Sequence, residues 1–301
     1  MRVKILKREF LVPALLAACL MAWALPAAAE PDATKSLALR LYGGYSHMAA
    51  GDINEGCDGY FELAEIYGAI GGGTIEGGYN PVHGGYNFGA DLVFQLSPWI
   101  GIGVGVGYMR SSSDSLMTLT EDPDVLTLSA TPTISAMPIR LGVFFTVPVA
   151  DKISLTADLG AAWYAGLKLE ASQRLEFAAD DWEEGALSAS RSDLANLGFQ
   201  GSLGFEYRLS PMIGLFVEAV GRYARFKNFE SVTGTSRDSD GGSGTTEGKI
   251  YLLTYTYPEG TYSRFIISEP PPVDDPPEIV VTEPKIDLSG FSLQAGFRVR
   301  F

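Results

Sequence analysis

Cysteine and histidine are scarce in this chain of 301 residues, which contains two of each. Cys19 lies in an apolar N-terminal run, so a chain cleaved after that run keeps only Cys57 and has no internal disulfide. The same count excludes a zinc site built on several cysteines. His47 and His83 are the only imidazoles, which leaves few candidates for a histidine general base.

The N-terminus has the pattern of a secretory signal peptide. Basic residues come first, an apolar run extends from Phe10 to Leu25, and Ala27-Ala28-Ala29 is a small-residue cleavage site. The apolar run is shorter than the roughly 20 residues that a membrane-spanning helix needs. We therefore predict a signal peptide over residues 1–29 and a mature chain over residues 30–301.

One cysteine raises a second possibility for processing of the N-terminus. The stretch Leu16 to Cys19 resembles the cleavage box of bacterial lipoproteins, in which the cysteine is acylated. The apolar run continues past Cys19 to Leu25, which is unlike such a box. Acylation of Cys19 therefore stays an open alternative to simple cleavage.

Lysine and arginine are absent from two long stretches of the chain. Residues 49–84 contain six Asp or Glu and residues 111–132 contain four, and neither stretch has a Lys or Arg. Residues 171–194 and 228–285 are also acidic, with six acids against two bases and ten against four. The formal net charge of −14 thus originates in these segments. Because they repel phosphate groups, we exclude nucleic acid as a partner.

The rest of the chain is dominated by alternation of apolar and polar residues, which is typical of β-strands with two different faces. Short connections at Ser97-Pro98, Pro148 to Lys152 and Ser210-Pro211 alternate with the four long acidic segments. This pattern predicts an all-β, antiparallel, up-and-down arrangement with short turns at one end and long loops at the other. The alternating segments are 37–46, 86–96, 100–108, 137–147, 153–169, 197–209, 213–223 and 290–301.

Three features indicate that the apolar face points outward into lipid. The polar face is rich in glycine, as in Gly101 to Gly107, which weakens a strand on a wet surface but makes room inside a narrow barrel. The apolar stripes step about ten residues, a rise of roughly 25 Å at the tilt of a membrane barrel. They tend to end on aromatic residues, which suit the headgroup layer. A soluble, lipocalin-like barrel with its apolar face inside is the alternative.

The C-terminus carries the most specific pattern of the chain. Phe297, Val299 and Phe301 alternate with arginines, and an aromatic residue comes last. This ending resembles the signal by which the barrel-assembly machinery recognises outer-membrane proteins. Together with the signal peptide, the short turns and the long loops, it makes the mature chain resemble the small outer-membrane β-barrels of the OmpX and OmpA-barrel type.

The resemblance implies a location and a set of partners. It implies a multi-pass protein of the Gram-negative outer membrane, with turns in the periplasm and loops 49–84, 111–132, 171–194 and 228–285 outside the cell. Membrane lipid, lipopolysaccharide, the barrel-assembly machinery and periplasmic chaperones are the implied partners of a monomer.

The number of spanning strands has two possible values. Eight alternating segments predict eight strands, and Lys249 to Ile267 reads as a further hairpin around Pro258-Glu259-Gly260. The arms of this hairpin are short and alternate poorly. We therefore expect an extension outside the membrane and an eight-stranded barrel, with ten strands as the alternative.

The polar face predicts a network of charges inside the barrel. An eight-stranded barrel is just wide enough for side chains to fill it, and buried charges must be paired. We expect a polar plug that closes the barrel, with a narrow porin-like channel for small or hydrophobic solutes as the alternative. The predicted network consists of Arg40, Asp91, Arg140, Asp158, Glu206, Arg208, Glu218, Arg222, Arg298 and Arg300.

Candidates for catalysis or metal binding are weak. His47 and its neighbour Ser46 point to opposite faces of a strand and form no nucleophile–base pair. Asp52, Asn54 and Asp58 have oxygen ligands at alternate positions but do not complete a calcium loop. We therefore expect no enzyme, no metal and no cofactor. The predicted function is a structural and surface-interaction role through acidic loops, with a rim-sited hydrolase as a remote alternative.

Overall fold

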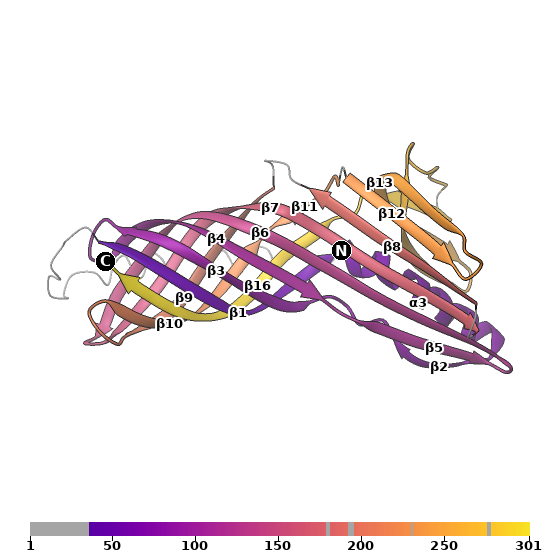
Figure 1. Cartoon of the computed structure of the whole chain (residues 1–301), viewed down its shortest axis with the longest axis horizontal. Helices are drawn as coiled ribbons and strands as arrows, with labels where there is room; N and C mark the ends of the chain where they lie inside the picture. Colours follow the sequence, from indigo (N-terminus) through magenta and orange to yellow (C-terminus); the bar gives the residue numbers. More distant parts are fainter. Residues whose placement is uncertain (1–35, 179–180, 192–195, 230, 276–277) are drawn as a thin grey trace.

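We describe the protein from a computed structural model, in which residues 36–178, 181–191, 196–229, 231–275 and 278–301 are described. The predicted signal peptide and Cys19 lie outside the described residues. The described chain forms one large antiparallel sheet of 16 strands together with a helix (Figure 1).

Eight strands of this sheet pair in a closed circuit. The order is β1, β3, β4, β6, β7, β9, β10, β16 and back to β1, and every neighbouring pair is antiparallel. Connections of a few residues join them at the end where the chain terminates (Figure 1). The bounds are β1 (Leu37–Gly51), β3 (Gly84–Gln95), β4 (Ile100–Ser112), β6 (Asp124–Ala150), β7 (Ile153–Ala178), β9 (Leu197–Arg208), β10 (Ile213–Tyr223) and β16 (Ile286–Arg300).

The two faces of the circuit differ as the alternation predicts. Apolar side chains point outward, and Leu41, Phe88 and Leu141 are 45%, 52% and 64% exposed. Charged side chains point inward, and Arg40 and Glu218 are 4% and 1% exposed. The outer surface of the circuit is therefore apolar and its interior is polar, which is the reverse of a soluble barrel.

The segments that the sequence predicts as long loops contain further strands. β6 and β7 continue beyond the circuit and carry the other strands of the sheet, except β11, which pairs with β16. These strands form an extension at the end opposite the C-terminus (Figure 1). The predicted hairpin is present as β13 and β14, which pair outside the circuit. The remaining strands are β2 (Thr74–Gly78), β5 (Ser115–Glu121), β8 (Asp181–Arg191), β11 (Arg225–Phe226), β12 (Ser231–Asp238), β13 (Ser243–Tyr257), β14 (Gly260–Ser268) and β15 (Ile279–Thr282).

A helix, α3 (Asp52–Gly71), fills the inner side of the extension. Its start is held by hydrogen bonds between Asp52 and Lys285, and it ends at Gly72, whose φ of 76° favours glycine. Glycines on the helix allow it to approach β14 closely. A Cβ on Gly59 would overlap the carbonyl oxygen of Ser263.

In the described ranges, no helix combines the length and the apolar character that crossing a bilayer requires.

A β-bulge at Gly166 reverses the faces of β7. Gly166 and Leu167 together lie opposite Ala136, and Gly166 has a φ of 56°. Beyond this point Leu167 and Leu169 are buried, whereas Lys168 lies between them on the other face. Unbroken alternation over 153–169 would place Leu167 on the outward face of Leu159, but Leu167 is buried, because one extra residue in a strand exchanges its faces.

Beyond the bulge the interior changes from polar to apolar. We call this cluster the upper apolar core, and it joins residues of β1, β7, β16 and α3 with residues of the extension strands. It closes the interior of the circuit on the side of the extension. Its members include Met48, Ile53, Cys57, Val82, Met109, Ile134, Tyr164, Leu167, Leu169, Phe226, Ile250, Ile286 and Leu288.

Candidate functional site

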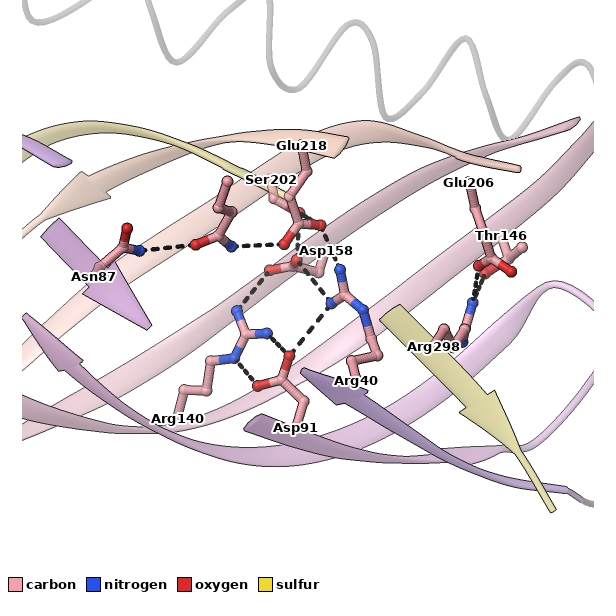
Figure 2. A network of polar contacts seen from close by, with 11 residues as sticks. Arg40, Asn87, Asp91, Arg140, Thr146, Asp158, Ser202, Glu206, Glu218 and Arg298 are labelled. Atoms are coloured by element: carbon pink, nitrogen blue, oxygen red, sulfur yellow. Dashed lines mark hydrogen bonds and ion pairs between the residues drawn. The ribbon is translucent and has the colours of Figure 1, made fainter. Parts of the chain in front are cut away.

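The interior of the circuit contains a central cluster of five charged side chains from five strands (Figure 2). Arg40 lies 2.5 Å from Glu218, 3.4 Å from Asp91 and 4.0 Å from Asp158. Arg140 donates through Nε to Asp91 at 2.5 Å and through a second nitrogen to the same carboxylate, and it lies 3.9 Å from Asp158. The fork of one guanidinium thus holds one carboxylate at two points, which fixes its orientation.

Strand register brings these residues together. Arg40 on β1 lies directly opposite Asp91 on β3, so that pair follows from the pairing alone. Arg140 is two strands away from Asp91, and Gly105 of β4 lies between them in register. A Cβ on Gly105 would collide with the Asp91 carboxylate. Glycine at this position therefore lets Arg140 reach across β4 to its partner.

Neutral polar groups and aromatic rings complete the surroundings of the central cluster. Gln294 donates to Glu218 at 2.6 Å and accepts from Asn87 at 2.8 Å, and Ser202 donates to Asp158 (Figure 2). The guanidinium of Arg40 lies 4.3 Å from the centroid of the Phe216 ring, a cation–π contact. These contacts satisfy hydrogen-bonding groups that would otherwise be buried without partners.

A second cluster lies nearer the turn end of the interior. Glu206 accepts from Arg298 at 2.9 Å and also from Arg300. Arg298 in turn donates to the hydroxyl of Thr146 at 3.2 Å. Glu206 and Arg298 are almost fully buried, whereas the Arg300 side chain is 23% exposed and lies close to the end of β16.

Two of the ten residues predicted for the network lie outside both clusters. Arg208 is exposed at the last position of β9, beyond the buried residues of that strand. The prediction that Arg208 belongs to the charge network is therefore wrong. Arg222 points inward and donates to the hydroxyls of Ser46 and Ser292 at 2.9 and 3.1 Å. It also donates to the carbonyl oxygen of Leu288 at 2.8 Å. In the described part of the chain, Arg222 makes no ion pair.

Sequence reasoning missed the neutral members of the site. Asn87, Ser202 and Gln294 are all on the polar faces that alternation identifies, but charge alone does not select them. The inward aromatic rings of Phe144 and Phe216 interrupt the polar face and gave no signal in the sequence. Both rings stack on buried arginines, which is visible only when the strands are placed around one interior.

The interior clusters leave little empty space. Beside Arg40, Asp158 and Arg298 the free volume is about 10 Å³, which is about the size of one water molecule. A second cavity of about 30 Å³ lies between the central cluster and the upper apolar core. Side chains therefore pack closely around Arg40, Asp158 and Arg298.

The C-terminal residues lie on the outer surface. The side chains of Phe297 and Phe301 are exposed, and the backbone N–H of Phe301 donates to the carbonyl oxygen of Leu37 at 2.8 Å. This bond joins the last residue of the chain to the beginning of β1. Their role as an assembly signal stays a prediction.

The histidines and the cysteine do not form a reactive group. The rings of His47 and His83 are tilted by 33° with centroids 5.4 Å apart, and Ser46 points to the opposite, buried face. Burial raises the pKa of the Cys57 thiol to about 12, so it stays protonated within the apolar core. Among the described residues, His, Cys, Asp and Glu side chains form no group of three that could hold a metal ion.

One solved structure is similar to the chain over most of its length. The chain is similar to the outer membrane protease OmpT from Escherichia coli, with 11% identity over 92% of this chain and 99% of that chain and a TM-score of 0.28. The prediction that the protein is not an enzyme is corrected, because a protease is found among the similar structures. A likeness this low does not itself show any activity for this chain.

The remaining comparisons concern the family of the chain. No curated protein matches it. The family model described as the outer membrane protein beta-barrel domain matches residues 15–245, which is most of the chain. An apolar outer surface around a charged interior, closed by strand pairing, is the architecture that such a domain requires. The chain belongs to the outer membrane protein beta-barrel domain family.

Proposed function

We propose that this outer-membrane protein is an eight-stranded transmembrane barrel that is exported by its N-terminal signal peptide. The closed circuit of eight pairings supports the strand number, because the strands of the extension pair outside the circuit. The exposed apolar side chains on the outside of the circuit suit contact with acyl chains. Membrane lipid and lipopolysaccharide are the proposed surroundings of a monomeric barrel. The barrel-assembly machinery and periplasmic chaperones are its proposed partners during biogenesis.

The proposed role of the barrel is to anchor the extension rather than to conduct. The main support for this proposal is that two layers of side chains lie one above the other inside the circuit. Ion pairs around Arg40 and Glu206 fill the lower part, and the upper apolar core covers them on the side of the extension. A solute would have to break buried ion pairs and then displace packed apolar side chains, and both steps are costly.

The extension is the proposed interaction surface. It contains the acidic segments of the chain, and on α3 burial together with the nearby carboxylates of Glu62 and Glu65 raises the pKa of Asp58. Such a surface attracts cations and cationic partners and repels anions. This distribution supports a surface-interaction role at the outer face of the membrane.

Planar-bilayer recording of the refolded protein tests the anchor against the narrow channel. We expect the native protein to give no reproducible unitary currents, because its interior is filled. A heat-modifiable band on an unboiled gel shows that the same preparation is folded. Reproducible unitary currents from folded protein would contradict the anchor and support the channel.

A further inference from the structure

Among the residues that the structure describes, Arg222 points into the interior without an ion pair to a carboxylate. Its guanidinium donates to Ser46, Ser292 and the carbonyl of Leu288, which are all neutral. By contrast, Arg40 and Arg298 each lie within 3 Å of a carboxylate oxygen. A cation taken from water without a counter-charge costs several kcal/mol by order of magnitude, so neutral acceptors alone leave its charge uncompensated.

Arg222 lies at a different level of the interior from the carboxylates of the central cluster. Along β1, Arg40 belongs to the central cluster, Ser46 contacts Arg222, and Met48 belongs to the upper apolar core. Arg222 therefore lies between a layer of ion pairs and a layer of apolar side chains. Gln294, which lines the same cavity as Arg222, donates to Glu218, so a neutral amide lies next to that carboxylate.

A cavity adjoins the guanidinium at this level. It has a volume of about 30 Å³ and is lined by Arg222, Gln200, Asn87, Gln294, Ser292 and Tyr42, among others. Gln200 lies directly opposite Arg222 in the register of β9 and β10. Its side-chain amide makes no hydrogen bond within the described chain, although it borders the cavity. The amide N–H of Gln200, which has no acceptor among the described residues, and the guanidinium of Arg222, which has no counter-charge there, thus border the same cavity.

We propose that this cavity binds a small monovalent anion of halide size. The guanidinium of Arg222 would supply the opposite charge, and the Gln200 amide would donate a hydrogen bond to it. Guanidinium and amide N–H groups are donors that an anion accepts. The carboxylates of the central cluster are bound to Arg40 and Arg140, so they do not occupy this position. The volume admits a single small ion and excludes large organic anions.

Halide-dependent stability of the full barrel tests this site. The refolded protein in detergent is unfolded with urea in sodium bromide and in sodium gluconate at equal ionic strength. Bromide fits the cavity and gluconate does not, so we expect a higher midpoint in bromide, rising with bromide concentration as linkage requires. Equal midpoints in the two salts would overturn the proposal and leave water as the occupant.

Matched variants connect the effect to the site. Arg222→Gln should remove the difference between bromide and gluconate, whereas Arg208→Gln, on an exposed arginine, should keep it. If Arg222→Gln does not fold, Gln200→Leu replaces the donor with an apolar group of similar size and should reduce the difference. A bromide effect that persists unchanged in the variants at 222 and 200 would place the ion elsewhere and refute the assignment. This readout does not depend on whether the barrel conducts.

Discussion

Replacing Asp91 with asparagine is the most direct test of the interior network. Asp91 is 1% exposed and accepts from both Arg40 and Arg140, so Asp91→Asn removes one charge that serves two buried cations. Removing one partner of a buried ion pair costs about 3–5 kcal/mol. With a urea slope of ~3 kcal/mol per M, the unfolding midpoint should fall by roughly 1–2 M.

The assay compares Asp91→Asn with a surface pair of the same protein. Lys168 and Glu170 lie 2.6 Å apart with side chains 43% and 49% exposed, and such a pair contributes about 0–1 kcal/mol. Both variants are unfolded in urea from the same lipid vesicles and followed by tryptophan fluorescence. If Asp91→Asn and Glu170→Gln shift the midpoint equally, the interior charges are not coupled as the distances indicate.

Two further substitutions probe the extension. Gly59→Ala places a methyl group against the carbonyl oxygen of Ser263, so α3 should detach and the extension should become sensitive to protease. As a control, Gly185→Ala places its methyl group in open space and should leave the protease sensitivity unchanged. Equal digestion of the two variants would contradict the close approach of α3 and β14. Burial, assisted by Glu62 and Glu65, raises the pKa of Asp58 to about 6. In the unfolded chain the pKa of an Asp is about 3.9, so the folded protein binds this proton more tightly. The contribution of Asp58 to the free energy of unfolding should therefore fall as pH rises from about 4 to about 6. Asp58→Asn should weaken that fall, measured as the pH dependence of the urea midpoint. A pH dependence equal to that of the native protein would refute the role of Asp58.

The strands of the circuit could be predicted because lipid and a narrow interior impose opposite demands on adjacent residues. The alternation predicts strands over 86–96 and 213–223, and the structure has β3 at Gly84–Gln95 and β10 at Ile213–Tyr223. The same alternation identifies Arg40, Asp91 and Glu218 as members of one face. Each of these statements needs only the period of two along a strand.

Apart from the hairpin of β13 and β14, the extension could not be predicted, because its pattern is not uniform. Residues 49–84 read as a loop, since the glycines of α3 at 56, 59 and 68 lower helix propensity and hide its apolar face. These glycines allow α3 to pack closely against β14 and β5, and such contacts between distant segments cannot be predicted from the sequence. Likewise, Gly166 looks like any other glycine until its left-handed backbone reverses the faces of β7.

Along the regular part of each strand of the circuit, local alternation was enough to predict most of the side chains that face lipid and most of those that face the interior, because it repeats every second residue. Which charged side chains pair with one another depends on the tertiary structure. Arg140 reaches Asp91 across Gly105, Arg208 lies past the end of the buried layer, and Arg222 is left beside a cavity without a carboxylate. Pairing between strands depends on register and on the level of each residue along the barrel, and both result from closing the sheet rather than from any one strand.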